Sequence, residues 1–245
     1  MNSPESVQKT SPLPSTSAQS TWEPVVRWSQ PEEQRAGTHL VVFLHGYGAD
    51  ENDLFSLATM LPAGYTVASV RAPMAMDHGG FTWFPLLQDF SSDPRLVATA
   101  VSNLQEWVAS QRPHFTTTTL LGFSMGMTMA TSLLRREPTA YAGIIGLSGF
   151  VLDTDVVADH PHAAAVTALL NAETDAAVRA AQPQVFWGRD PHDPIIDAQR
   201  VGYTRNWLEA NTQVTTEVYS GVGHGIHPQE VHDFVNFLQH ITAQQ

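Results

Sequence analysis

A chain of 245 residues is long for one domain and short for two, and its 42% of hydrophobic residues is enough for a three-layer core. The formal charge of −12 would repel nucleic acid and anionic membranes, so neither is expected as a partner. The absence of cysteine excludes disulfides, zinc–thiolate sites and cysteine catalysis. The sequence shows neither the pattern of a secretory leader nor a membrane-length apolar run, so we expect a soluble, cytoplasmic protein without stable membrane association.

Residues 1–21 are rich in Ser, Thr, Pro and Gln, which predicts a flexible tail ahead of a single domain over residues 22–245. In chain order, we predict a strand at Val25–Trp28, a strand at His39–Leu44, a helix at Asp50–Leu61, a strand at Tyr65–Val70, a helix at Pro94–Ser110, a strand at Thr117–Leu121, a helix through Met129 and Leu134, strands at Ala142–Leu147 and Val185–Trp187, a helix at Ile195–Glu209, a strand at Val214–Tyr219 and a helix at Val231–Ile241. This alternation predicts an α/β fold with a mostly parallel sheet between helices on both faces.

The segment G-F-S-M-G at residues 122–126 joins a predicted strand directly to a predicted helix. In that context, G-x-S-x-G forms a sharp turn that presents the serine at the first turn of the helix, where free amides and the helix dipole stabilise an oxyanion. We therefore predict that Ser124 is a nucleophile. The alternative is a glycine-flanked serine that only caps the helix.

A nucleophilic serine needs a base and a carboxylate that orients the base, and with this turn they follow in the order Ser, acid, His. His224 lies in G-V-G-H-G directly after the last predicted strand, so we predict that it is the base. Asp190 and Asp193 both follow the strand Val185–Trp187. We favour Asp193, because proline stiffens the following D-P-I-I and its isoleucines can anchor it in the core. Asp190 remains an alternative acid, although a role in hydrogen-bonding the loop is favoured for it.

Two backbone amides are needed to bind the carbonyl oxygen of a substrate. The residue after the nucleophile supplies one, which predicts the amide of Met125. The loop H-G-Y-G at residues 45–48 follows the first long buried strand, and its glycines allow the backbone to turn amides inward. We assign the second amide to Tyr47 and expect His45 to brace this loop as a buried, hydrogen-bonded side chain.

The segment between Met74 and Phe90 carries more apolar side chains than a solvent-exposed loop needs. They either seal the rim of the core or form a binding site for an apolar acyl or aryl group. We predict the second role for a set of five residues that also includes Phe150, namely Phe81, Trp83, Phe84, Leu86 and Phe150. The expected partner is a small-molecule ester or thioester with an apolar acyl group.

Seven segments together carry a resemblance to a known family: LHGYGADENDL (44–54), RAP (71–73), GGFTWF (79–84), LLGFSMG (120–126), LSGF (147–150), DPII (193–196) and GHGI (223–226). In this order they resemble the phospholipase/carboxylesterase family of α/β-hydrolases, which includes the acyl-protein thioesterases, over residues from about 38 to 240. The resemblance implies a compact hydrolase with little or no lid that cleaves esters or thioesters without a cofactor. It also supports Asp193 and His224. Many members carry glutamine after the nucleophile, where this chain has Met125, but only the backbone amide is needed there.

Three other functions are alternatives to this one. A peptidase or lactone hydrolase of the same fold would use the same residues on another substrate. A non-catalytic relative that only binds a ligand is disfavoured, because all three members of the Ser/Asp/His set are present. A metal site on Asp159, His160 and His162 is least favoured, because no further ligand is evident in the sequence.

Overall fold

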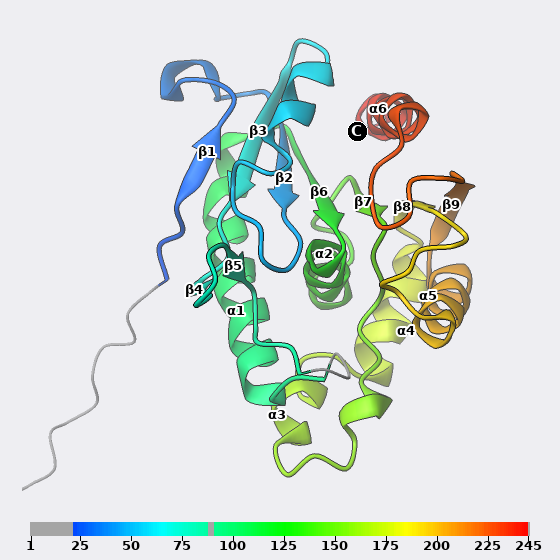
Figure 1. The fold of residues 1–245 in the computed structure, drawn as a ribbon. Helices are drawn as coiled ribbons and strands as arrows, with labels where there is room; N and C mark the ends of the chain where they lie inside the picture. Colours follow the sequence, from blue (N-terminus) through cyan, green and yellow to red (C-terminus); the bar gives the residue numbers. More distant parts are fainter. Residues whose placement is uncertain (1–21, 88–90, 245) are drawn as a thin grey trace, which may run out of the picture.

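Among the described residues, seven strands form one sheet, in which neighbouring strands lie in the spatial order β1–β3–β2–β6–β7–β8–β9. A computed structural model describes residues 22–87 and 91–244 (Figure 1). Strand β1 is antiparallel to β3, and every other neighbouring pair is parallel. The strands are β1 (Val26–Trp28), β2 (His39–Leu44), β3 (Tyr65–Val70), β6 (Thr117–Phe123), β7 (Gly143–Leu147), β8 (Gln184–Arg189) and β9 (Gln213–Val218).

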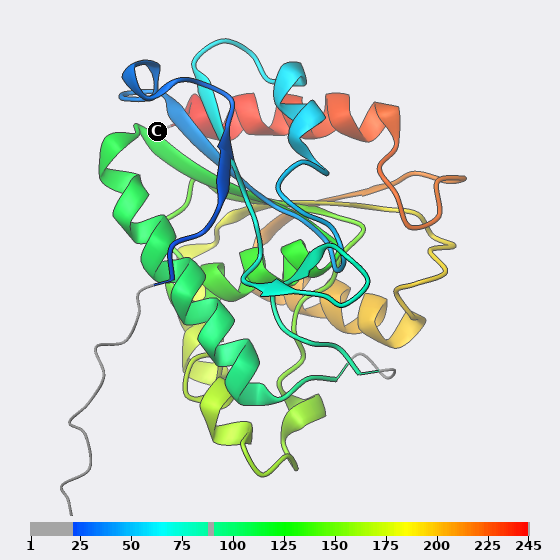
Figure 2. The ribbon, with the colours of Figure 1, turned by 60° about the vertical axis from the view of Figure 1, so that its left-hand side comes forward.

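Helices cover both faces of this sheet, which confirms the predicted three-layer α/β fold (Figure 2). One face packs against α1 (Pro94–Gln111), α2 (Met125–Arg136), α4 (Ala172–Ala181) and α5 (Ala198–Asn211). The other face packs against α6 (Pro228–Thr242), with the 3₁₀ helix η2 (Phe55–Met60) beside it. The short helix α3 (Ala163–Thr167) lies against α1.

The central strands are buried on both sides, which explains why they read as continuous apolar runs rather than as alternating patterns. In β2, Leu40 and Val42 point into the core under α1 and α2. Val41 and Phe43 point into the core under α6. All four side chains are fully buried.

The predicted helix Asp50–Leu61 is wrong, because turns occupy its first half and only the 3₁₀ helix η2 follows. The Asp50 carboxylate accepts a hydrogen bond from the Asn52 amide at 2.8 Å, and Glu51 forms two hydrogen bonds with Arg71 at 2.6 Å. The Asp50 contact to nearby backbone competes with the helical pattern, and the Glu51 contact holds this segment to a distant part of the chain.

Other elements differ in their limits or were not predicted. Helix α5 begins at Ala198 rather than Ile195, because the Asp197 carboxylate caps it by accepting the Arg200 amide at 2.8 Å. The hairpin of β4 (Met74–Ala75) and β5 (Phe81–Thr82) was not predicted, nor were α3 and α4. The predicted tail, residues 1–21, lies outside the described residues. Within the described part of the chain, no helix is both long and apolar enough to span a bilayer.

Candidate active site

Ser124 lies in a sharp turn between β6 and α2, with φ of 53° and ψ of −119°. A side chain at such a positive φ is strained, and the surrounding packing must hold it there. The turn depends on two close approaches: a Cβ on Gly122 would lie 2.2 Å from the carbonyl carbon of Gly126, and a Cβ on Gly126 would lie 1.8 Å from the Leu44 carbonyl oxygen. Both positions therefore require glycine, as the motif predicts.

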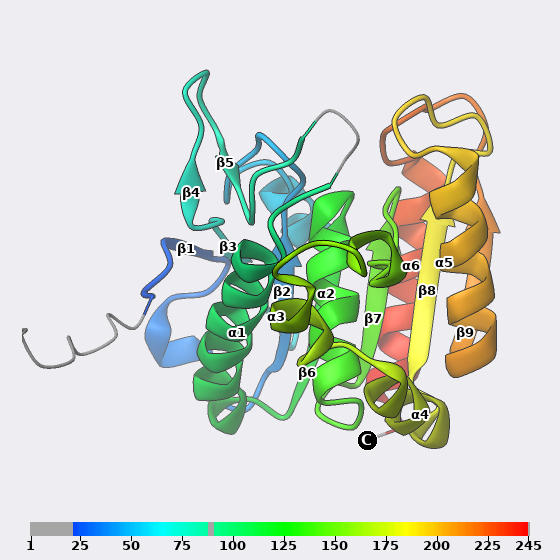
Figure 3. The same cartoon turned by 90° about the horizontal axis from the view of Figure 1, so that it is seen from below.

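Three residues that are far apart in the sequence meet at the carboxyl ends of the parallel strands. The Ser124 Oγ lies 2.9 Å from His224 Nε2, and His224 Nδ1 lies 2.8 Å from Asp193 Oδ2. In Figure 3, the loops after β8 and β9, which carry Asp193 and His224, lie together beyond the arrowhead of β8. The structure thus brings together the three side chains that were predicted to act together.

The second oxygen of the Asp193 carboxylate is also engaged. Oδ1 accepts hydrogen bonds from the amides of Ile195 at 2.8 Å and Ile196 at 3.2 Å. The carboxylate is therefore fixed by its own loop while Oδ2 faces the imidazole. Only Ile196 is buried in the core, whereas Ile195 is 45% exposed, so the expected anchoring by both isoleucines is wrong for Ile195.

Asp190 is 1% exposed and contacts the backbone of the histidine loop. Its Oδ2 accepts three consecutive amides, from Gly221, Val222 and Gly223, at 2.7–2.8 Å. Its Oδ1 accepts the His192 amide at 2.8 Å, and this bond, followed by that from Gly223, lowers the pKa of Asp190 to about 2. Asp190 therefore orders the loop just before His224, while Asp193 contacts the ring itself.

Ser148 holds the same loop from the other side, a contact that sequence reasoning missed. Its backbone has a φ of 46° at the end of β7. The Ser148 hydroxyl donates to the Gly225 carbonyl at 2.8 Å, and its amide donates to the Gly188 carbonyl at 2.8 Å. The residue that follows His224 is thereby tied to the centre of the sheet. The only signal in the sequence was a serine placed directly after a buried strand.

Tyr47 and Met125 both line the cavity beside Ser124. Among the described residues, neither backbone amide donates a hydrogen bond to a protein acceptor. The Tyr47 loop approaches the turn closely, since a Cβ on Gly46 would lie 3.3 Å from the Ser124 Cβ. The Met125 side chain is buried, and its sulfur accepts a hydrogen bond from the Thr82 hydroxyl at 3.4 Å. Both amides are therefore available for a ligand oxygen.

His45 braces this loop, as predicted. Its Nδ1 donates to the Gly46 carbonyl at 2.7 Å, and its Nε2 accepts the Ala72 amide at 3.0 Å. The side chain is buried, and this burial lowers the pKa of His45. A neutral imidazole with one donor and one acceptor satisfies both contacts.

A cavity of about 600 Å³ lies beside Ser124. Its apolar and aromatic walls come from several loops and include Tyr47, Leu86, Leu87, Phe123, Phe150 and Ile195. Leu86 and Phe150 were predicted to bind substrate, and the structure places both at this cavity. Tyr47 also lines the cavity, and Phe123 and Ile195, which line it too, were not singled out for this role.

The other three residues predicted to bind substrate lie elsewhere. Trp83 is 1% exposed, and its indole donates to the His45 carbonyl at 3.0 Å, so it seals the rim of the core. Phe81 lies under the Arg71 guanidinium, 4.5 Å from the ring centre. Phe84 is buried and lines a different cavity. The sequence pattern identified an apolar segment correctly but not the direction of each side chain.

The candidate metal ligands Asp159, His160 and His162 do not form a metal site. His160 Nδ1 accepts the His162 amide at 3.1 Å, which occupies its lone pair. Across residues 22–87 and 91–244, no group of three or more His, Asp or Glu side chains is arranged to hold a metal ion.

Comparison with known families agrees with this arrangement. The family model described as Phospholipase/Carboxylesterase matches residues 30–242. The chain belongs to this family. This family match confirms the resemblance noted from the sequence motifs. Among curated proteins, no sequence match was found.

Solved structures of two esterases and a thioesterase share the fold. Esterase PE8 superposes with a TM-score of 0.71 at 22% identity, covering 90% of this chain and 100% of that one. A Bacillus cereus carboxylesterase gives 0.70 at 22% identity, with 91% and 97% covered. Acyl-protein thioesterase 2 from Zea mays gives 0.66 at 18% identity, with 89% and 98% covered. At these identities the likeness establishes the α/β-hydrolase fold alone, and the family match adds its esterase and thioesterase class of hydrolase.

Proposed function

We propose that this family member is a serine carboxylesterase or thioesterase that acts through an acyl-enzyme on Ser124. One observation carries the proposal: a continuous hydrogen-bonded path runs from the Ser124 hydroxyl through His224 to Asp193, with distances of 2.9 and 2.8 Å. Such a path lets the imidazole take the serine proton while the carboxylate holds its orientation and tautomer.

In the first half of the reaction, the Ser124 Oγ attacks the acyl carbon as His224 Nε2 accepts the hydroxyl proton. The oxyanion that forms accepts hydrogen bonds from the amides of Tyr47 and Met125. Asp193 stabilises the imidazolium. Collapse of the tetrahedral intermediate breaks the bond to the leaving alcohol or thiol, which takes the proton from His224 and departs.

In the second half, His224 accepts a proton from water as the water oxygen attacks the acyl-enzyme. The second tetrahedral intermediate collapses to release a carboxylic acid, and the proton returns from His224 to the Ser124 oxygen. These steps need no cofactor. The apolar walls of the 600 Å³ cavity favour a neutral acyl group over a charged one.

A fluorophosphonate probe tests the nucleophile directly, because it forms a covalent bond only with an activated serine. We expect one label on Ser124, located by mass spectrometry, and none in Ser124→Ala. Ser124→Ala and His224→Ala should each lower turnover of an activated ester by about 10⁴–10⁶. Ser110→Ala, an exposed serine on α1, is the matched control and should keep both activity and labelling. Labelling that persists in Ser124→Ala, or a mild loss in His224→Ala, would overturn the assignment.

Turnover of substrates that share one acyl group shows which leaving groups the protein accepts. An ester, a thioester, an amide and a lactone of matched size separate esterase and thioesterase activity from peptidase and lactonase activity. We expect turnover of the ester and the thioester to exceed that of the amide.

A further inference from the structure

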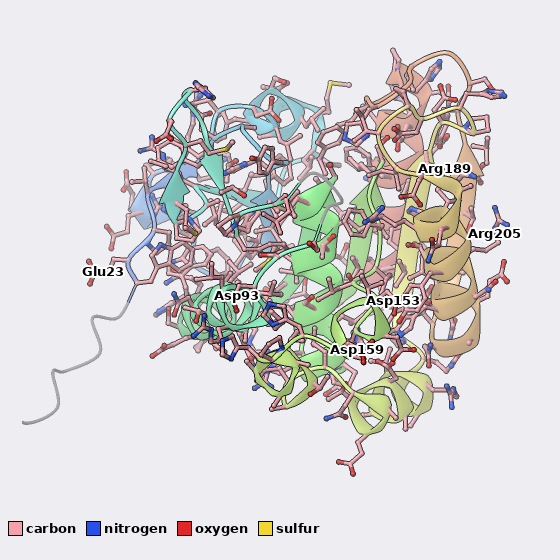
Figure 4. The ribbon with its side chains drawn as sticks, turned by 60° about the horizontal axis from the view of Figure 1, so that its bottom comes forward. Glu23, Asp93, Asp153, Asp159, Arg189 and Arg205 are labelled. Carbon is pink, nitrogen blue, oxygen red and sulfur yellow. The ribbon has the colours of Figure 1, made fainter. Side chains whose placement is uncertain are left out.

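A second cavity, of about 340 Å³, lies beyond the one beside Ser124. Its walls come from the start of α1, the segment after β7, α3 and the start of α5, and they include Phe84, Val97, Val156, Val166 and Tyr203. Asp153, from the segment between β7 and α3, also lines it, and Asp93, which caps α1, lies on the same face of the molecule (Figure 4). Nothing in the proposed reaction uses this cavity.

Phe150 is the one described residue that lines both cavities. Phe150 therefore lies between the space next to Ser124 and the space next to α1 and α3. Leu86 and Leu87 line the first cavity only, and Ser92 lines the second only.

The backbone around Phe150 is tied at three successive points. The Phe150 carbonyl accepts the Thr128 hydroxyl at 3.0 Å, and the Val151 amide donates to the Thr204 hydroxyl at 3.0 Å. The Leu152 carbonyl accepts the Arg135 guanidinium at 3.0 Å, and that buried arginine is paired with Asp175 at 2.7 Å. These bonds fix the main chain from Phe150 to Leu152, so a substitution at position 150 changes the side chain and leaves the backbone anchored.

We propose that the second cavity is a distal continuation of the acyl site, and that the Phe150 ring closes the passage to it and so sets the longest acyl chain the protein accepts. This inference rests on the proposed esterase function. The ligand is a neutral aliphatic chain, because the lining is mainly hydrocarbon. Of the two charged residues at the wall, Arg200 is paired with Asp197, and the Asp153 carboxylate disfavours an anionic end group.

The chain-length profile measures this limit. Each buried methylene is worth about a fourfold gain in kcat/KM, the equivalent of about 0.8 kcal/mol. The wild-type protein should show this gain up to the length at which the chain meets Phe150, and a plateau or fall beyond it. In Phe150→Ala, the gain should continue through longer chains, while Phe150→Trp should move the limit to shorter ones.

The experiment uses 4-nitrophenyl esters of straight-chain acids from acetyl to dodecanoyl with the full-length protein. Fluorophosphonate labelling of Ser124 counts the folded, active sites in each variant, and Phe150→Leu replaces the alanine variant if that one does not fold. The double variant Phe150→Ala/Val156→Trp refills the second cavity from an exposed wall position and should lose the gain on long chains.

Two results would overturn the inference. One is a Phe150→Ala profile with the same length limit as the wild type, and the other is a gain on long chains that survives in the double variant. In either case, hydrolysis of short esters by the wild type leaves the proposed function standing. If the wild type hydrolyses no ester and Ser124 takes no label, the proposed function fails and the inference fails with it.

Discussion

Glu230 is a fully buried carboxyl group in the first turn of α6, a few residues after the loop that carries His224. Its Oε2 accepts the His227 amide at 3.0 Å. Its Oε1 has no hydrogen-bond partner among the described residues and packs against Gly188, where a Cβ would lie only 2.1 Å away. Burial raises the pKa of Glu230 from 4.5 to about 7, with a smaller contribution from the nearby Asp233.

A carboxyl group whose pKa is raised in the folded state favours the protonated form there. The folded protein therefore loses stability as the pH rises from the unfolded pKa of 4.5 to the folded pKa of about 7, and the loss is complete above that. The full difference corresponds to about 3 kcal/mol in the free energy of unfolding. Between about pH 5 and about pH 8, the expected loss is about 2.5 kcal/mol.

Glu230→Gln removes this titration but keeps an oxygen for the His227 amide, since glutamine also serves in this capping arrangement. Urea unfolding near pH 5 and near pH 8 gives the difference between wild type and variant at each pH. The variant should gain about 2.5 kcal/mol over the wild type on going to the higher pH, or about 5–10 °C in Tm. Glu209→Gln, an exposed glutamate on α5, is the control and should follow the wild type. Parallel pH profiles for wild type and Glu230→Gln would refute the reasoning.

The remaining predictions concern the acid residues and the loop that carries His224. Asp193→Asn should lower kcat by about 10⁴, because an amide beside Nδ1 favours the wrong imidazole tautomer. Asp190→Asn should lower kcat/KM by only about 10–100-fold, through a small displacement of His224. If Asp190→Asn and Asp193→Asn lowered the rate of ester hydrolysis by the same factor, the separate roles would be contradicted. Ser148→Ala, which removes one hydrogen bond to the Gly225 carbonyl, should cost about fivefold in kcat/KM, and crystal structures of the variant would show whether the loop moves.

The elements and residues that the sequence predicted correctly are those fixed by local chemistry. Strands buried on both faces need long apolar runs, so β2 and β3 were predicted at the limits that the structure gives. The turn at Ser124 requires glycine on both sides, because the backbone of β2 and the start of α2 come too close for a Cβ. Such requirements leave a mark in a short stretch of sequence.

The misplaced elements depend on contacts between distant segments. The turns after Asp50 replace a helix because Glu51 pairs with Arg71, which is 20 residues further along the chain. Trp83 is of a residue type that suits an apolar binding site, but it points inward, because its indole donates a hydrogen bond to the carbonyl of His45. Periodicity carries no information about which partner a side chain meets across the fold.

The roles of the two aspartates after β8 are distinguished by the structure and not by the sequence motif. Asp190 and Asp193 are three residues apart, and either can reach the edge of the sheet. They differ in their hydrogen-bond partners: Asp190 accepts three backbone amides of the histidine loop, which leaves its Oδ2 no room for an imidazole. Asp193 binds amides with one oxygen and leaves the other for His224 Nδ1. A loop with so many glycines needs an anchor before its histidine can hold one position. The segment after β8 supplies both this anchor, Asp190, and the partner of the ring, Asp193.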